Sequence, residues 1–137
     1  MYQKDYILRM ISMLMKFLGE LSGLIKKGEL KEAADMLEKS YNTYLREDAA
    51  FFQGIPAKDL AQKLLTEHNY TAGHLEILAE LFYAESELRV AGNDKSGCIE
   101  FSEKSLILFE FVDNEYKTYS DERLRKMEVL RKRITTG

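Results

Sequence analysis

Residues 28–40 carry the pattern that decides the fold, and they read GELKEAADMLEKS. Apolar or small side chains recur at Leu30, Ala33 and Leu37, a spacing of three and four residues that places them on one face of an α-helix. Gly28 stands directly before this pattern, and glycine commonly ends a helix because it tolerates a left-handed backbone. The stretch therefore predicts two helices separated by a turn at Gly28.

A second copy of the pattern follows 65 residues later. Residues 33–40, AADMLEKS, align with residues 98–105, CIEFSEKS, and the two segments share the Glu-Lys-Ser triplet. Each also has an acidic residue four positions before a lysine, a spacing that supports an ion pair on a helix. Each copy follows a helix that ends at a glycine, Gly28 or Gly92, and the second turn is one residue longer. The chain is therefore expected to contain two similar helical hairpins.

The same periodicity extends in both directions from these segments. The predicted helices span residues 4–27, 29–48, 57–66, 72–91, 96–117 and 122–134, and the second is open to extension through Phe51 and Phe52 as far as Gly54. We expect an all-α fold, with one domain over residues 1–137. In it, two hairpins form a right-handed stack, the short helix links them, and the last helix caps the second hairpin.

The first segment resembles half of a tetratricopeptide repeat. Gly28 stands at the glycine between the two helices of that repeat, Ala33 at the first small residue of its second helix, and Ser40 where the family usually has alanine. The family's large apolar and tyrosine positions correspond to Phe17 and Leu24 in the first unit and to Leu81 and Leu88 in the second. The resemblance covers about two thirds of the chain and implies a tetratricopeptide-like stack.

Three features depart from the tetratricopeptide pattern. The units are 65 residues apart instead of about 34, two units are fewer than the usual minimum of about three, and neither unit ends in proline. The two ends of the chain, MYQKDYILRMI at residues 1–11 and YSDERL at residues 119–124, also resemble a family of small, uncharacterised bacterial proteins. That second resemblance implies a single domain and supplies no function.

Composition and charge narrow the classes of function. The chain is 45% hydrophobic and has a net charge of -3. That charge is the balance of about +3 in residues 1–27, -9 in residues 28–120 and +3 in residues 121–137. An acidic middle argues against a broad nucleic-acid surface, although it would attract the basic ends within one chain or between two copies. The single cysteine, the absence of a signal-peptide pattern and the absence of a long uncharged apolar stretch lead us to expect a cytoplasmic protein without membrane insertion.

Motifs for chemistry are weak. His68 and His74 are six residues apart and do not share a helix face as a pair of metal ligands would, so we expect capping or surface roles for them. Cys98 aligns with Ala33, which favours a packing role over a reactive thiol. Gly19 and Gly23 lack the flanking residues of a phosphate-binding loop, and their spacing favours close approach of another helix. We predict no catalytic residues, no metal site and no cofactor.

A basic run near the C-terminus is the best candidate for electrostatic binding. It consists of Arg123, Arg125, Lys126, Arg131, Lys132 and Arg133. Such a run suits an acidic partner, RNA or a membrane surface. It equally suits a solvated helix end, where cations are favoured by the helix dipole.

Apolar faces in excess of one core suggest assembly. The helices predicted at residues 4–27 and 96–117 each have a second apolar set beside the inner one. We therefore expect a non-catalytic protein-interaction module, a homodimer in its simplest form, that captures a partner helix or peptide. The candidate contact residues are Phe17, Tyr41, Tyr44, Phe101, Leu108 and Phe111.

Three other functions remain open at this point. One is a small-molecule or lipid-tail binder whose pocket is lined by Met10, Met13, Phe82 and Phe109. Another is peripheral association with a membrane or RNA through the basic ends. The least favoured is an enzyme, because no paired acid and base is visible.

Overall fold

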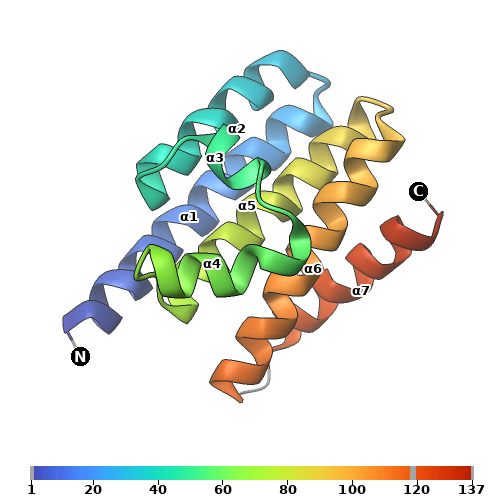
Figure 1. Ribbon diagram of the computed structural model, residues 1–137. Helices are drawn as coiled ribbons and strands as arrows, with labels where there is room; N and C mark the ends of the chain where they lie inside the picture. The colour runs from blue at the N-terminus through green and yellow to red at the C-terminus, as the bar shows by residue number, and fades with distance from the viewer. Residues whose placement is uncertain (1, 118–119, 137) are drawn as a thin grey trace.

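The computed structural model describes residues 2–117 and 120–136, and over these ranges its regular structure is helical throughout (Figure 1). The helices are α1 (Tyr2–Lys26), α2 (Leu30–Leu45), α3 (Ala49–Gln53), the short 3₁₀ helix η1 (Ala57–Asp59), α4 (Leu60–Glu67), α5 (Ala72–Ala91), α6 (Lys95–Tyr116) and α7 (Asp121–Thr136). The predicted all-α class is confirmed. No helix within these ranges is both long and apolar enough to cross a bilayer.

The second predicted helix is shorter than the sequence suggested. It ends at Leu45 because Arg46 adopts a left-handed backbone with φ 67°, while its N–H still donates to the Asn42 carbonyl. Asp48 is then extended, and α3 begins anew at Ala49. The extension through Phe51 and Phe52 was therefore wrong as one continuous helix, since the chain changes direction between α2 and α3.

The two hairpin turns share one geometry. At the first, Gly28 has φ 81°, the Gly28 N–H donates to the Ile25 carbonyl, and the Glu29 N–H donates to the Leu24 carbonyl. At the second, Asn93 has φ 60°, and the corresponding bonds run from Asn93 to Val90 and from Asp94 to Arg89. Both are Schellman-type caps. Asn93, not Gly92, is thus the counterpart of Gly28, and the 65-residue offset continues through the turn without an extra residue.

Helices α1, α5 and α7 run in the same direction, with α2 and α6 antiparallel to them (Figure 1). Contacts fix the alignment of α1 on α5. Near one end Ile7 touches Gly73, where an added Cβ would overlap the Ile7 side chain. At the other end the Ser22 hydroxyl donates to the Glu87 carboxylate at 3.2 Å. Gly73 is therefore the glycine that permits close approach to α1.

Gly19 and Gly23 do not have the role that their spacing predicted. A Cβ built on either residue would meet no atom within 4 Å outside its own helix turn. Within the described residues, no atom of another helix lies against the face of α1 that carries these two positions. That prediction was wrong because spacing alone does not show which face of α1 turns toward α5.

Helix α5 is the centre of the fold. Its buried residues include Leu75, Leu78, Phe82 and also Glu80 and Glu85, since α1, α2 and α6 all pack against it. Figure 1 shows α3 and α4 on one side of this layer, where α3 packs against α2 and α4 packs against α6. The large aromatic residues of the core are fully buried there.

The second apolar face of α6 is covered by the chain itself. Both η1 and α4 pack against α6, and Phe101 and Leu108 on that helix are 4% and 0% exposed. Phe111 is half-buried against the same core. Of the two surplus apolar faces that led us to expect assembly, the one on α6 is therefore covered within the chain.

Candidate functional site

The basic C-terminal run binds acidic and polar groups of the same chain. Arg123 pairs with Asp113 at 2.9 Å, Lys126 with Glu80 at 2.6 Å, Arg131 with Glu110 at 3.5 Å and Arg125 with Glu122 at 3.1 Å, while Arg133 donates to the Ser86 hydroxyl at 2.6 Å. Three of these pairs join α7 to α5 or α6 through carboxylates. The acidic middle of the chain thus attracts its own basic end, and most of the run is engaged before any partner arrives.

The pair between Glu80 and Lys126 is buried. The two residues are 6% and 9% exposed. Burial raises the pKa of the Glu80 carboxyl, and the adjacent Lys126 ammonium partly offsets this effect. The Tyr83 ring lies beside the pair, with Lys126 Nζ 5.6 Å and Arg133 Cζ 5.0 Å from its centroid. These contacts hold α7 over α5 at a short distance from α1.

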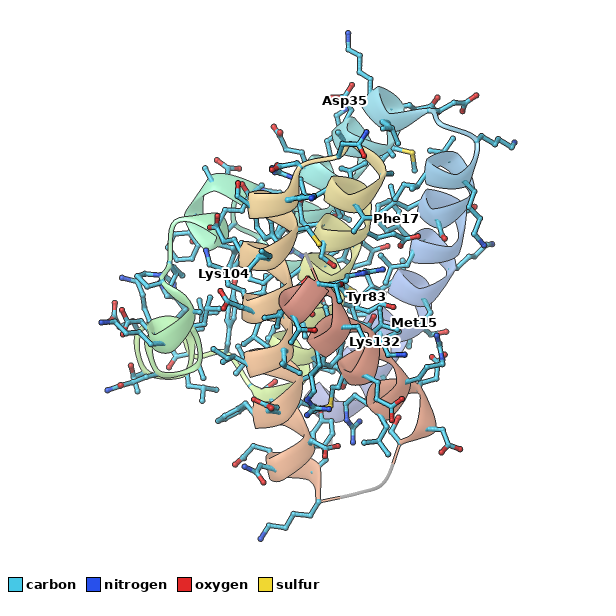
Figure 2. The ribbon with its side chains drawn as sticks, turned by 90° about the vertical axis from the view of Figure 1, so that its right-hand side faces the viewer. Met15, Phe17, Asp35, Tyr83, Lys104 and Lys132 are labelled. Carbon is cyan, nitrogen blue, oxygen red and sulfur yellow. The ribbon has the colours of Figure 1, made fainter. Side chains whose placement is uncertain are left out.

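A groove of about 470 Å³ lies between α1 and α7, and its floor is α5. We refer to it as the α1–α7 groove. The α1 wall includes Met15 and Leu18, and the floor includes Tyr83 and Ala84. The α7 wall contributes Glu122, Arg125, Lys126 and Arg133. Figure 2 shows Met15 on α1 beside α7, with Tyr83 close to them. The α1 wall is thus apolar at Met15 and Leu18 and polar at Ser22 and Lys26, and the α7 wall is charged.

The apolar wall belongs to a longer stripe on α1, formed by Leu8, Ile11, Met15 and Leu18. The spacing of three and four residues puts these side chains on one helix face. Leu8 is 55% exposed and the other three are half-buried. The seam that α1 turns to the core is different, and it consists of Ile7, Leu14, Leu21 and Ile25. The α1 stripe is thus apolar surface that the core leaves partly uncovered.

The predicted contact residues fall into two groups. Tyr41, Phe101 and Leu108 are 0%, 4% and 0% exposed, so they pack the core and cannot touch a partner while the chain is folded. Phe17 and Tyr44 are half-buried and form a tilted ring pair with centroids 6.0 Å apart. Both lie between α1 and α2, outside the α1–α7 groove. An amphipathic pattern shows on which face of its helix a residue lies. It does not show whether a distant segment of the chain covers that face.

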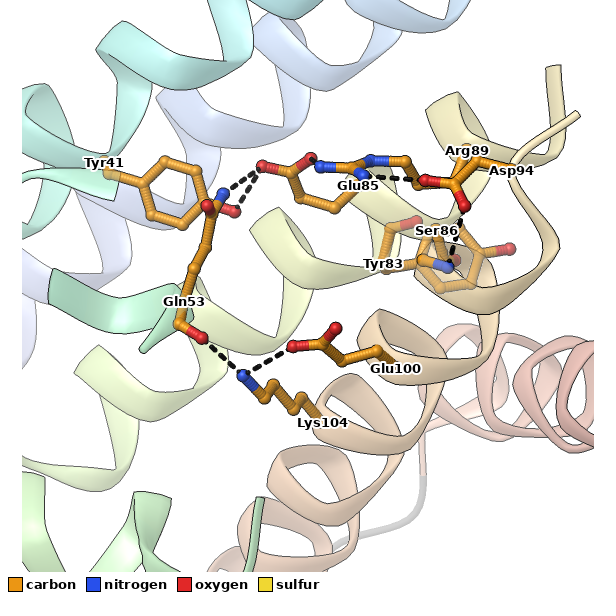
Figure 3. Close-up of polar contacts among 10 residues, drawn as sticks. Tyr41, Gln53, Tyr83, Glu85, Ser86, Arg89, Asp94, Glu100 and Lys104 are labelled. Atoms are coloured by element: carbon orange, nitrogen blue, oxygen red, sulfur yellow. Dashed lines mark hydrogen bonds and ion pairs between the residues drawn. The ribbon is translucent and has the colours of Figure 1, made fainter. Parts of the chain in front are cut away.

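The amino-acid sequence did not lead us to predict a polar network that lies in the core (Figure 3). The Glu85 carboxylate accepts hydrogen bonds from the Tyr41 hydroxyl at 2.9 Å and from the Gln53 amide at 2.8 Å, and Arg89 lies 3.9 Å away. Burial raises the pKa of the Glu85 carboxyl. The sequence does carry one signal of this network, because Glu85 is an acidic residue on a face of α5 that the helix turns to the core.

The same network fastens the α3 segment to α6. Lys104 is 5% exposed, and its ammonium donates to the Gln53 carbonyl at 2.6 Å and pairs with Glu100 at 3.2 Å. Gln53 thus binds Glu85 through its side chain and Lys104 through its backbone. These groups are satisfied within the fold, so their arrangement is structural.

The pocket predicted for a small molecule or lipid tail does not form from the expected residues. Phe82 and Phe109 are fully buried, whereas Met13 is 59% exposed. Met10 lines a surface pocket, and that pocket lies at the other end of α1 from the α1–α7 groove. The pocket that Met10 lines contains none of the other three residues.

The two histidines lie at helix ends, and the single cysteine is buried. His74 is in the first turn of α5, where its Nδ1 accepts the Thr71 N–H at 2.9 Å. His68 follows the last residue of α4. Cys98 is 3% exposed, and its Sγ lies 3.8 Å from the Ser102 hydroxyl. Among residues 2–117 and 120–136, no group of three or more His, Cys, Asp or Glu side chains is placed to hold a metal ion.

Comparison of the chain with protein-family models, with curated proteins and with solved structures finds no match. The site is therefore interpreted from its own geometry.

Proposed function

We propose that the chain is a non-catalytic interaction module that binds an amphipathic helix or peptide of a partner protein in the α1–α7 groove. The observation that carries the proposal is the α1 stripe, which is apolar, contributes Met15 and Leu18 to the wall of the groove and is not part of the buried seam of α1. An amphipathic segment places its apolar residues at the same spacing as such a wall, and this is a recurrent mode of peptide recognition.

The arrangement of the helices supports a tetratricopeptide-like reading. Helices α1 and α5 are in contact at positions 65 or 66 residues apart, Ile7 with Gly73 and Ser22 with Glu87. The first helices of the two hairpins thus lie side by side, and α7 continues the row next to α5 through Lys126 and Glu80. In stacks of helical hairpins such a row forms an extended binding surface. This part of the proposal is an analogy between folds.

The size of the apolar surface favours a peptide over a stable homodimer. Over residues 5–26 of α1, the large exposed apolar residues are Tyr6, Leu8 and Met13, at 40%, 55% and 59%. Together they expose roughly 300 Å², taking 150–250 Å² for a large side chain. A standard stable interface buries about 800 Å² on each partner. Self-association through α1 alone would therefore be weak, whereas a peptide in the groove also gains the floor and the α7 wall.

Site-specific photo-crosslinking tests the proposal. A photoreactive amino acid is placed at Met15 in the groove or, as a control, at Lys39, which is exposed on α2. The variants are expressed in the cells from which the protein comes. We expect a discrete product with another protein from Met15 and none from Lys39. Leu18→Glu places a charge in the apolar wall and should abolish the product, and Lys39→Glu should leave it unchanged.

Three results would overturn the proposal. The first is equal crosslinking from both positions. The second is a product that persists in Leu18→Glu, provided that circular dichroism shows the variant to be folded. The third is a product consisting of two copies of this chain, which would replace a separate partner with self-assembly.

A further inference from the structure

A second pocket, of about 250 Å³, lies where four segments meet at the other end of the molecule. Its lining comes from the start of α1, the end of α2, the link between α4 and α5, and the first turns of α5. Ile7 and Ile77 contribute buried apolar surface. The pocket shares no residue with the α1–α7 groove, so it is a separate site.

Aromatic rings form much of the wall. Tyr6, Tyr44 and Tyr70 line the pocket together with His68 and His74. The Tyr70 hydroxyl donates to the Leu45 carbonyl at 2.6 Å, and the Tyr70 ring stacks on His74 with centroids 4.7 Å apart and an interplanar angle of 21°. Tyr70 is therefore held in one orientation. Aromatic faces carry partial negative charge, and they attract cations that have lost water.

The charges around the rings favour a positive ligand. Glu47 lines the pocket, and its carboxylate is close enough to Tyr70 to contribute, after burial, to raising the pKa of that phenol. The C-terminal end of α2 lies at the same place, and helix C-termini carry partial negative charge.

Two basic residues that line the pocket, His74 and Arg46, oppose a cation only slightly. Burial lowers the pKa of the His74 imidazole, which favours its neutral form at pH 7. Arg46 also lines the pocket, but the residue is exposed, so water screens its charge.

We propose that this pocket binds a small free organic cation of the alkylammonium class. Tyr6, Tyr44 and Tyr70 supply aromatic surface to its lining, and Glu47 supplies the counter-charge. The volume of about 250 Å³ corresponds to roughly eight waters at about 30 Å³ each. It therefore suits a ligand the size of a trimethylammonium alcohol, and it is smaller than the usual pocket for drug-sized molecules.

Choline and its uncharged carbon analogue 3,3-dimethylbutan-1-ol have nearly the same shape and provide the test. Each is titrated into the full chain while the NMR signals of the tyrosine and histidine rings are followed. Choline should give saturable shifts confined to the rings of the pocket. The neutral analogue should bind at least about tenfold more weakly, because a desolvated cation over aromatic rings gains roughly that factor.

Two substitutions separate charge from shape. Glu47→Gln and Tyr44→Leu should each weaken choline binding several-fold, whereas Glu103→Gln, which removes a carboxylate from an exposed position on α6, should leave it unchanged. Equal binding of choline and its neutral analogue would overturn the proposal. So would full affinity in Glu47→Gln, or shifts that stay linear through the millimolar range.

Discussion

Replacement of Lys126 by methionine is the sharpest test of how α7 is attached. Lys126 Nζ lies 2.6 Å from Glu80 Oε1, and the two residues are only 9% and 6% exposed. Methionine keeps most of the side-chain volume and leaves the Glu80 carboxylate buried without its counter-ion. Breaking a buried pair in this way costs about 3–5 kcal/mol of unfolding free energy. The matched control is Arg125→Met, which breaks the pair with Glu122.

Arg125→Met shows how much unfolding free energy is lost when an exposed ion pair is broken. The side chains of Arg125 and Glu122 are 61% and 67% exposed, and an exposed pair contributes about 0–1 kcal/mol. Urea unfolding followed by circular dichroism at pH 7 measures both changes. We expect a large loss for Lys126→Met and little change for Arg125→Met. A loss below about 1 kcal/mol for Lys126→Met would refute the buried attachment of α7 to α5.

The pH dependence of the loss provides a second check. Burial raises the pKa of Glu80 in the folded protein above its unfolded value, and removal of the lysine raises this pKa further. A raised carboxyl pKa means that the folded state holds its proton more tightly, so the penalty is absent below the unfolded pKa and grows as pH rises through the folded one. The destabilisation by Lys126→Met, measured against wild type at each pH, should therefore shrink between pH 7 and about pH 4.5.

A double variant completes the cycle. Glu80→Gln combined with Lys126→Met removes the buried charge that the single variant leaves behind, so it should recover a large part of the lost stability at pH 7. If the double variant is less stable than Lys126→Met at that pH, the loss does not come from an unpaired carboxylate.

Two further predictions concern the core. Gly73→Ala should destabilise the protein by about 1–3 kcal/mol because the new Cβ would overlap Ile7. Gly23→Ala, with open space around its Cβ, should stabilise α1 by roughly 0.5–1 kcal/mol. Thermal unfolding of both variants measures these changes, and equal effects would contradict the packing of α1 on α5. Tyr41→Phe removes a buried hydrogen bond to a carboxylate and should cost about 1.5–3 kcal/mol in urea unfolding. Tyr44→Phe, at a half-buried position, should change stability by no more than about 0.5 kcal/mol, and a loss as large as that of Tyr41→Phe would show that burial does not explain the difference.

Much of the helical framework could be predicted because its determinants are local. The spacing of Leu30, Ala33 and Leu37 and the left-handed turn at Gly28 depend on residues within one or two helix turns. The 65-residue repeat in the sequence reappears as the contact between Ser22 and Glu87. The end of α2 was misplaced because Arg46 takes a left-handed backbone conformation, which is uncommon for a residue other than glycine.

The candidate site could not be predicted in the same way. Tyr41, Phe101 and Leu108 have the amphipathic placement of contact residues, yet all three are buried. The second apolar face of α6 looks unpartnered in sequence, yet η1 and α4 pack on that helix. Which apolar surface is covered depends on segments far apart in the chain, and periodicity carries no information about them.

The amino-acid sequence by itself determined that the chain forms helices, where the two hairpins turn and that its charges are segregated, since helix faces, caps and local charge follow from neighbouring residues. Only the tertiary structure decided that the basic run of α7 is paired with α5 and α6, and that the α1 stripe stays partly open beside a groove. The physical reason is that burial and ion pairing depend on contacts between distant segments. Forming such contacts lowers the entropy of the chain, and this loss is offset only when the whole core forms.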